Sequence, residues 1–337
     1  MTDLFIVDLP HVWAALIAFA VFAYVVLDGF DLGIGMLFPL LRDGEERATA
    51  QASIAPVWDG NETWLVMGGG GLLAAFPAAY GIVLNALYVP VTAMLLGLVF
   101  RGVAFEFRVR SRRRKWLWDI AFSGGSLVAA LSQGAILAGL LQKPRVVDGA
   151  FAGGPFDWAT PFAALVAVAL VAGYALLGAT WLVLKTEGAL QERARRLAQA
   201  ALALTLAFIG LVSLATPFLD DGYFDRWFHM PGLVFSVLVP GLLALAAWRC
   251  WIDAQAGSGL RAYAAAIAVF ALCYAGIGIS IAPQIVPGSL TIAEAAAPAI
   301  SLRFLLVGAL VLIPLILAYT GFAFWVFRGK VDRDSHY

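Results

Sequence analysis

Long apolar runs follow one another along this chain and constrain its fold more than any other feature. Each is long enough to cross the roughly 30 Å hydrocarbon core of a bilayer as an α-helix. We therefore predict an all-α polytopic membrane protein with nine transmembrane helices. The runs cover roughly residues 12–40, 54–77, 80–107, 116–141, 160–184, 198–219, 231–252, 262–283 and 304–327.

Composition leaves no room for a sizeable soluble domain. Of 337 residues, 62% are hydrophobic and 13% are charged, whereas about a quarter of an ordinary soluble domain is charged. No Lys or Arg precedes the first run, so it lacks the basic region of a cleavable signal peptide and is expected to be retained. We expect a single integral membrane domain over 1–337. The run spacing allows a first four-helix bundle (1–142), a second four-helix bundle (143–283), and a peripheral ninth helix with a cytoplasmic tail (284–337).

Basic residues predict the orientation in the membrane. With the N-terminus outside and the C-terminus in the cytoplasm, seventeen of the 22 Lys and Arg residues fall on the cytoplasmic side and four on the other. Cytoplasmic loops carry such an excess of positive charge. The run "RVRSRRRK" is then a cytoplasmic loop, and no nucleic-acid partner is expected. The seventeen are Arg42, Arg47, Arg108, Arg110, Arg112, Arg113, Arg114, Lys115, Lys185, Arg193, Arg195, Arg196, Arg249, Arg261, Arg328, Lys330 and Arg333.

Ionisable residues interrupt the first three runs. The stretch "VVLDGFDLGIGML" places two aspartates three residues apart, hence on one helix face. With the predicted topology, the ionisable residues of all three runs reach the same depth, in the cytoplasmic half of the membrane. Asp119 joins them at the inner interface. The candidate site consists of Asp28 and Asp31 in the first run, Trp58, Asp59 and Glu62 in the second, and Arg101 and Glu106 in the third.

The five candidate carboxylates outnumber the one buried cation. A charge at this depth costs several kcal/mol unless it is paired, hydrated or protonated. Arg101 can neutralise one carboxylate, so the others are suited to carrying protons or to binding a cation. The alternative is a structural pair of Arg101 with Asp31 or Glu106, with the remaining groups lining a static polar pocket.

Glycines and histidines add two expectations. The glycine-rich stretches Gly29–Gly35 and Gly68–Gly71 favour close helix packing, and the alternative is a surface for a flat cofactor or a quinone tail. The three histidines, His11, His229 and His336, all lie near expected helix ends or the C-terminus. A chain that ligated several haems would need histidines within its spans. We predict that this chain alone ligates no haem, and the spacing of residues indicates no metal site.

The segments "LDGFDLGIGML" and "IAPVWDGNETWLV", together with "LLGLVFRGVAFEFR", closely resemble subunit II of the cytochrome bd-type quinol oxidases, including the cyanide-insensitive branch. The resemblance implies an enzyme that oxidises quinol and reduces dioxygen to water with protons taken from the cytoplasm, in a bacterial inner membrane. It implies two haems b and one haem d or d-like, ligated chiefly by a partner, subunit I, in a heterodimer. Membrane lipids and quinone are further expected partners, and small single-span accessory subunits remain open.

The resemblance also implies roles for the candidate residues. Asp59 matches a carboxylate on a proton path, and Asp31 matches a buried aspartate close to it. Arg101 matches a basic residue that balances Asp31 or a haem propionate, whereas Glu62 matches less well. Two other functions stay open at this point. The first is a purely structural partner subunit, and the second is a proton-coupled transporter, whose carboxylates would lie near the membrane midplane.

Overall fold

The computed structural model describes residues 8–42, 44–111 and 113–331. Arg112, Arg333 and His336, which were assigned to the cytoplasmic side or to the C-terminus, lie outside these ranges. The described part is almost entirely helical, as the apolar runs predict. Eight of its helices are long and apolar enough to cross a membrane. They are α1 (Leu9–Leu37), α4 (Pro77–Arg110), α5 (Lys115–Leu141), α6 (Pro161–Lys185), α7 (Gly188–Ala215), α9 (Gly232–Ala256), α10 (Gly259–Ile281) and α12 (Ala299–Val326).

The second expected run, 54–77, corresponds to α3 (Trp58–Ala75), which has 18 residues. This helix is not among the eight, because its first turns are polar and four glycines lower its hydropathy. Nine spanning helices therefore stay a prediction. The same is true of the division into two four-helix bundles and a ninth helix.

Short elements connect the long helices. Two antiparallel hairpins are the only strands in the described part. The hairpins are β1 (Val146–Val147) with β2 (Ala150–Phe151), and β3 (Gln284–Val286) with β4 (Leu290–Thr291); the short helices are η1 (Phe38–Leu40), α2 (Glu45–Ile54), η2 (Thr216–Phe218), α8 (Asp221–Phe228) and α11 (Ile292–Ala295).

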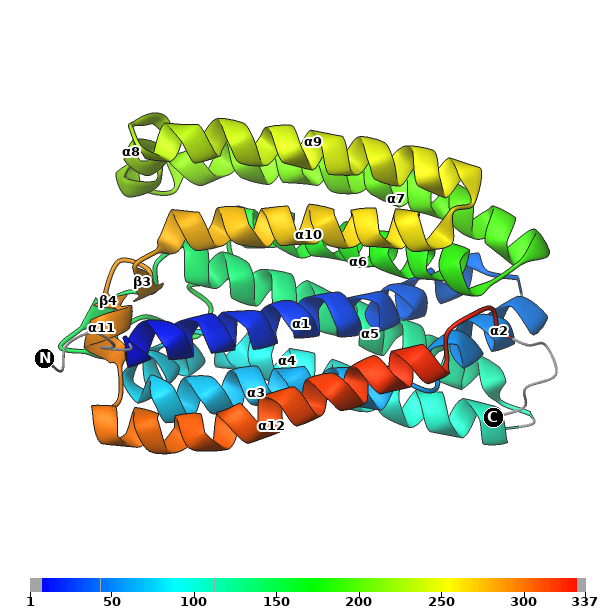
Figure 1. Ribbon diagram of the computed structural model, residues 1–337, viewed down its shortest axis with the longest axis horizontal. Helices are drawn as coiled ribbons and strands as arrows, with labels where there is room; N and C mark the ends of the chain where they lie inside the picture. The colour runs from blue at the N-terminus through cyan, green and yellow to red at the C-terminus, as the bar shows by residue number, and fades with distance from the viewer. Residues whose placement is uncertain (1–7, 43, 112, 332–337) are drawn as a thin grey trace, which may run out of the picture.

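Helix α1 lies in the middle of the molecule (Figure 1). It packs against α6 on one side and against α3 and α5 on the other. The consecutive pairs α4 with α5, α6 with α7 and α9 with α10 are antiparallel neighbours. Because α1 contacts helices from both halves of the sequence, it joins them into one body.

Glycines allow the backbones of neighbouring helices to touch. A Cβ atom on Gly33 of α1 would lie 1.9 Å from the carbonyl oxygen of Tyr174 in α6. Gly97 of α4 and Gly125 of α5 bring these two helices together in the same way. A Cβ atom on Gly97 would lie 2.7 Å from the carbonyl oxygen of Gly125, and a Cβ atom on Gly125 would lie 2.6 Å from the carbonyl oxygen of Gly97. The expected close packing is confirmed at these positions. Within Gly68–Gly71 it holds only in part, since Gly69 and Gly70 face open space.

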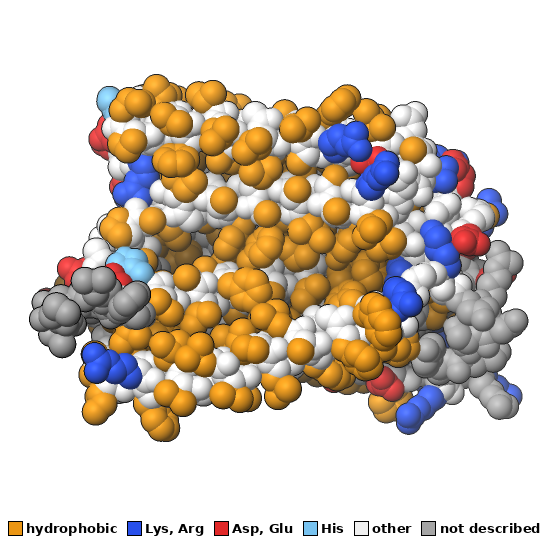
Figure 2. Space-filling model, viewed as in Figure 1, with side chains coloured by type: hydrophobic (Ala, Val, Ile, Leu, Met, Phe, Trp, Pro, Cys, Tyr) orange, Lys and Arg blue, Asp and Glu red, His pale blue; other side chains and the backbone are white. Residues whose placement is uncertain are grey.

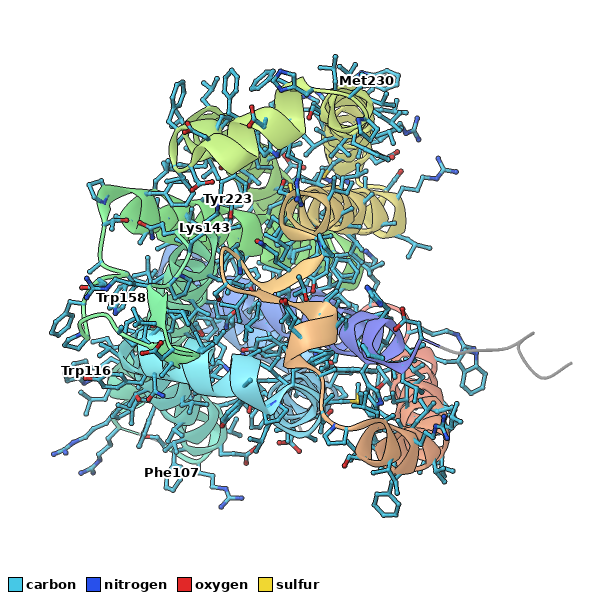
Figure 3. The ribbon with its side chains drawn as sticks, turned by 90° about the vertical axis from the view of Figure 1, so that its left-hand side faces the viewer. Phe107, Trp116, Lys143, Trp158, Tyr223 and Met230 are labelled. Carbon is cyan, nitrogen blue, oxygen red and sulfur yellow. The ribbon has the colours of Figure 1, made fainter. Side chains whose placement is uncertain are left out.

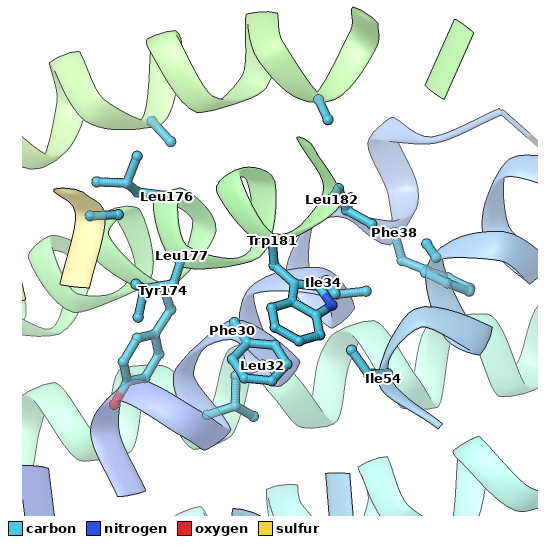
Figure 4. Packing of buried hydrophobic residues seen from close by; sticks show 14 of the residues in the cluster. Phe30, Leu32, Ile34, Phe38, Ile54, Tyr174, Leu176, Leu177, Trp181 and Leu182 are labelled. Carbon is cyan, nitrogen blue, oxygen red and sulfur yellow. The ribbon is translucent and has the colours of Figure 1, made fainter. Parts of the chain in front are cut away.

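An aromatic cluster fills the contact between α1, α6 and α10, and Figure 4 shows its members Phe30 and Trp181. The rings of Phe30 and Trp181 are stacked, with 4.1 Å between their centroids. Tyr263 of α10 meets the same two rings edge-on. Large aromatic side chains contribute much of the packing energy of a core, so this cluster fixes α1 against the later helices.

The surface has the character of a membrane protein. In Figure 2 a broad hydrophobic zone covers the middle of the molecule, and Lys and Arg side chains gather mainly at the end where α7 begins. The opposite end carries few basic residues, and one of them, Lys143, lies over the ring of Tyr223 (Figure 3), with 5.2 Å from Nζ to the ring centroid. The chain therefore has two ends of different charge, separated by an apolar zone.

Candidate functional site

Three helices bring the candidate residues to one end of the molecule. Asp28 and Asp31 lie in the last ten residues of α1, and Arg101 lies in the last third of α4. Glu62 lies in the second turn of α3, which runs in the opposite direction to both. Antiparallel connection therefore places the end of α1, the start of α3 and the end of α4 at the same depth, as the sequence predicts.

Arg101 is the centre of the site. Its Nη1 donates to Oδ1 of Asp28 over 2.5 Å, and its Nη2 donates to Oε1 of Glu62 over 2.6 Å. Arg101 is 1% exposed and Asp28 is fully buried. The pairs considered from the sequence, with Asp31 or Glu106, are wrong. All these carboxylates lie at similar depth, and the rotation of α4 about its axis aims the guanidinium at Asp28 and Glu62 instead.

Asp31 lies beside this ion pair with no cation in contact among the described residues. Its Oδ2 accepts a hydrogen bond from Nδ2 of Asn61 over 2.8 Å, and its Oδ1 has no partner. The side chain is fully buried. A buried carboxylate without a cation is costly in its ionised form, so Asp31 is the carboxyl of this cluster best suited to hold a proton.

Asp59 and Glu106 lie apart from the buried cluster. Both side chains are exposed, and neither forms an ion pair within the described ranges. Asp59 lies in the first turn of α3, where the helix dipole favours a negative charge. Trp58 is half-buried, and its ring packs 5.1 Å from that of Phe105. The structure therefore joins Asp28, Asp31, Glu62 and Arg101, and leaves the other two carboxylates on the surface.

A second ionic cluster was only partly anticipated. Asp119 does lie at the expected end of the molecule, where it accepts hydrogen bonds from Arg108 and Arg47 over 2.5 Å and 2.9 Å. Arg108 also donates to the side chain of Gln51 over 3.0 Å. Because Arg47 and Gln51 belong to α2, this cluster fixes α2 across the ends of α4 and α5.

Sequence reasoning also missed a polar chain in the middle of the bundle. Tyr174 donates to Oε1 of Gln133 over 2.5 Å, and Nε2 of Gln133 donates to the hydroxyl of Tyr24 over 2.9 Å. Tyr24 lies one helical turn before Asp28 on α1. A signal was present, since Gln133 is a glutamine within an apolar run and needs a hydrogen-bonding partner there.

The described residues do not fit axial ligation of haem by histidine. His11 lies in the first turn of α1 beside Asp8, and His229 lies between α8 and α9, both exposed. No group of three or more His, Cys, Asp or Glu side chains in the described part is arranged to hold a metal ion. We derive no step through a haem bound to this chain, and the prediction that it ligates none stays a prediction.

These features define a class, namely a polytopic helical membrane protein with a buried guanidinium shared between carboxylates near one end. Residues 9–327 match the family described as cytochrome bd terminal oxidase subunit II. The chain belongs to this family, and it is therefore a subunit of a terminal oxidase and an integral inner-membrane protein.

Individual relatives agree over nearly the whole chain. It is 30% identical to the cytochrome bd-I ubiquinol oxidase subunit 2 of Escherichia coli (strain K12), over 97% of this chain and 96% of that one. It is 29% identical to the cytochrome bd ubiquinol oxidase subunit 2 of Bacillus subtilis (strain 168), over 97% and 98%. A chain of the bd oxidase from Geobacillus thermodenitrificans has the same fold, with a TM-score of 0.77 at 18% identity, over 95% and 98%.

Proposed function

We propose that this chain is the second subunit of a quinol oxidase that reduces dioxygen to water, and that it supplies carboxylates for proton uptake from the cytoplasm. It also supports a larger partner, subunit I, which carries the two haems b and the haem d or d-like group. The names of the relatives, ubiquinol oxidase subunit 2, support the quinol reaction. The buried charges support the proton role.

One observation carries the proton proposal. Asp28, Asp31 and Glu62 lie around a single buried guanidinium, that of Arg101, which pairs with Asp28 and Glu62, while Asp31 is bonded to Asn61. Full ionisation would leave two uncompensated negative charges in a medium of low polarity, at a cost of several kcal/mol each. The cluster avoids this cost by holding protons, and a group that holds a proton at this depth can also pass it on.

The exposure of the carboxylates falls from the start of α3 toward α1. Asp59 is exposed, the Glu62 side chain is 30% exposed and Asp31 is fully buried. Asp59 and Glu62 are three residues apart and lie on neighbouring turns of one helix face. We infer a path that receives protons at Asp59 and leads through Glu62 toward Asp31. Trp58 lies beside its entrance.

The orientation and the partner contact belong to the same proposal. The end of the molecule rich in Lys and Arg faces the cytoplasm by the positive-inside rule, with the N-terminus outside. Asp59 and Glu106 then lie at the cytoplasmic side, and Glu106 shares one face of α4 with Val103 and Phe107, which are exposed. Carboxylates on an apolar surface at this depth need cover, and subunit I would supply it. Contact of Arg101 with a haem propionate of that subunit stays a prediction.

A purely structural role is the second candidate. It is favoured by the two ion pairs of Arg101, with Asp28 and with Glu62, which join three helices. In that case the cluster would only hold α1, α3 and α4 together. A proton-coupled transporter fits less well, because its carboxylates are expected near the midplane, whereas these four residues lie toward one end.

The substitution Asp59→Asn distinguishes the two roles, because it keeps the shape but cannot carry a proton. If the proposal holds, haem content stays normal while quinol-driven oxygen consumption falls about tenfold or more, the scale of losing a positioned acid–base group. The matched control is Asp148→Asn, an exposed aspartate in the turn between β1 and β2. Full turnover in Asp59→Asn with haem intact would leave the structural role standing.

A further inference from the structure

The chain Tyr174–Gln133–Tyr24 ends beside Asp28. Its three members come from α6, α5 and α1, and its two hydrogen bonds measure 2.5 Å and 2.9 Å. Tyr24 and Asp28 are four residues apart on α1 and therefore share a helix face. Asp28 is fully buried, and its Oδ2 atom has no partner, while its Oδ1 is held by Arg101.

The hydrogen bonds of this chain point in one direction. Tyr174 donates to the amide oxygen of Gln133, and the amide nitrogen of Gln133 donates to the oxygen of Tyr24. The Tyr24 hydroxyl lies one helical turn from Asp28, whose Oδ2 has no hydrogen-bond partner, so rotation of the hydroxyl would direct its proton toward that oxygen. Successive donors in a chain polarise one another and strengthen the last one. A donor directed at a carboxylate favours its charged form.

We propose that Gln133, with Tyr24 and Tyr174, is a positioning group that keeps Asp28 permanently ionised as the fixed partner of Arg101. Glu62 is then the partner that exchanges protons. An amide side chain neither releases nor takes up a proton near neutral pH. The hydrogen-bonded chain through Gln133 therefore cannot deliver a proton to Asp28. When Glu62 takes up a proton, Arg101 keeps one anion, and no unpaired guanidinium is left in the membrane.

The surroundings of Asp28 are consistent with this division of roles. The charged or titratable groups that face it are Tyr24 and Asp31 of α1, Glu62 of α3, Arg101 of α4 and Tyr174 of α6. Arg101 is the one cation in this set. Glu62 alone of the three carboxylates reaches solvent, through the 30% of its side chain that is exposed.

The proposal rests on the proposed proton uptake for its effect on turnover. Without the donor chain, Oδ2 of Asp28 has no donor within reach, and a proton can occupy this oxygen instead. Glu62 must then stay ionised to balance Arg101, and it no longer exchanges protons. In the purified holoenzyme, Gln133→Leu and Tyr24→Phe should each move the acidic limb of the pH–turnover profile to higher pH by about one unit. Tyr174→Phe, which removes only the far donor, should give a smaller shift in the same direction.

Infrared spectroscopy tests the charge of Asp28 without turnover. Tyr24→Phe should show an additional carbonyl stretching band of a protonated carboxylic acid as the pH is lowered. This band should persist when Asp31→Asn or Glu62→Gln is added, which assigns it to Asp28. The matched control is Gln142→Leu, which alters the glutamine that caps the C-terminal end of α5, nine residues after Gln133, and that is bonded to Ala138 and Thr160. It should leave both the pH profile and the infrared spectrum unchanged.

Each outcome decides between the proposals. Wild-type pH profiles in Gln133→Leu and Tyr24→Phe, with normal haem and no new infrared band, would overturn the role of the donor chain. A new band that depends on Asp28, together with full turnover in Asp59→Asn, would support the donor chain and reject the proton path. The two failures are therefore distinguishable.

Discussion

Arg101 and Asp28 form an ion pair between α4 and α1 although they are 73 residues apart in the sequence, with 2.5 Å from Nη1 to Oδ1. Neither side chain reaches solvent to any useful extent. Because water cannot replace either partner, this buried ion pair holds α4 and α1 together. Asp31, one turn further along α1, contacts Asn61 instead.

This difference between the two aspartates predicts opposite outcomes for one substitution. Asp28→Asn removes the most buried partner of Arg101, and breaking a buried ion pair costs about 3–5 kcal/mol. We expect poor assembly and loss of haem from the purified complex. Asp31→Asn leaves both ion pairs of Arg101 intact, so the complex should assemble with normal haem. The measurements for both variants are the haem content per protein and the thermal stability of the complex in detergent. Equal losses in the two variants would contradict the pairing of Arg101 with Asp28.

The orientation is open to a fusion experiment. Alkaline phosphatase is active only outside the cytoplasm, so a fusion after Lys143, in the segment between α5 and α6, should be active. A fusion after Arg196, near the start of α7, should be inactive. The reverse pattern would place the carboxylate cluster on the outer side and reject uptake from the cytoplasm.

Expression of this chain without subunit I tests the haem prediction. The histidines of the described part, His11 and His229, are exposed near the end of the molecule opposite the Lys- and Arg-rich end, so the lone chain should purify without stoichiometric haem. Visible absorption spectra provide the measurement. A b-type Soret band that survives purification would contradict the prediction and would direct attention to Met67 and Met94 as ligands.

At the end of the molecule that carries few basic residues, Asp220 predicts a pH-dependent contribution to stability. A hydrogen bond from Lys143 and a second from the Gly222 N–H hold the pKa of Asp220 below its usual value. The unfolded chain binds the proton more tightly, so this contribution is present above the ordinary range, near pH 4, and is lost as the pH falls below it.

Because the Asp220 side chain is 41% exposed, the effect is small, about 0.5 kcal/mol or less. Asp220→Asn should lower the melting temperature slightly at pH 6, and the difference from the wild type should disappear near pH 3. Thermal unfolding of the purified complex across this range is the measurement. A difference that grows toward low pH would show the opposite sign and reject the interpretation, and Asp148→Asn again serves as the control.

The sequence by itself determined the helices and their depth. Apolar run length is a local property, so the start of α4 at Pro77 and the end of α5 at Leu141 lie within three residues of the expected limits. The alternation of short connections then placed the charged ends of α1, α3 and α4 together. Pro90 lies within α4, and Leu87, three residues before it, has non-helical angles (φ −123°, ψ 18°), the disturbance that a proline causes in a helix.

Only the tertiary structure decided which side chains meet. From the sequence, Asp31 and Glu106 were the two candidates for the partner of Arg101, and spacing alone did not single out Asp28, which shares a face of α1 with Asp31. Rotation of α4 and the position of α3 selected Asp28 and Glu62. The chain from Tyr174 through Gln133 to Tyr24 likewise depends on how three helices pack. The length and depth of a run follow from the solubility of each residue in lipid, which is a local property. A contact between side chains depends on the rotation and separation of whole helices, and these are set by the packing of all side chains together.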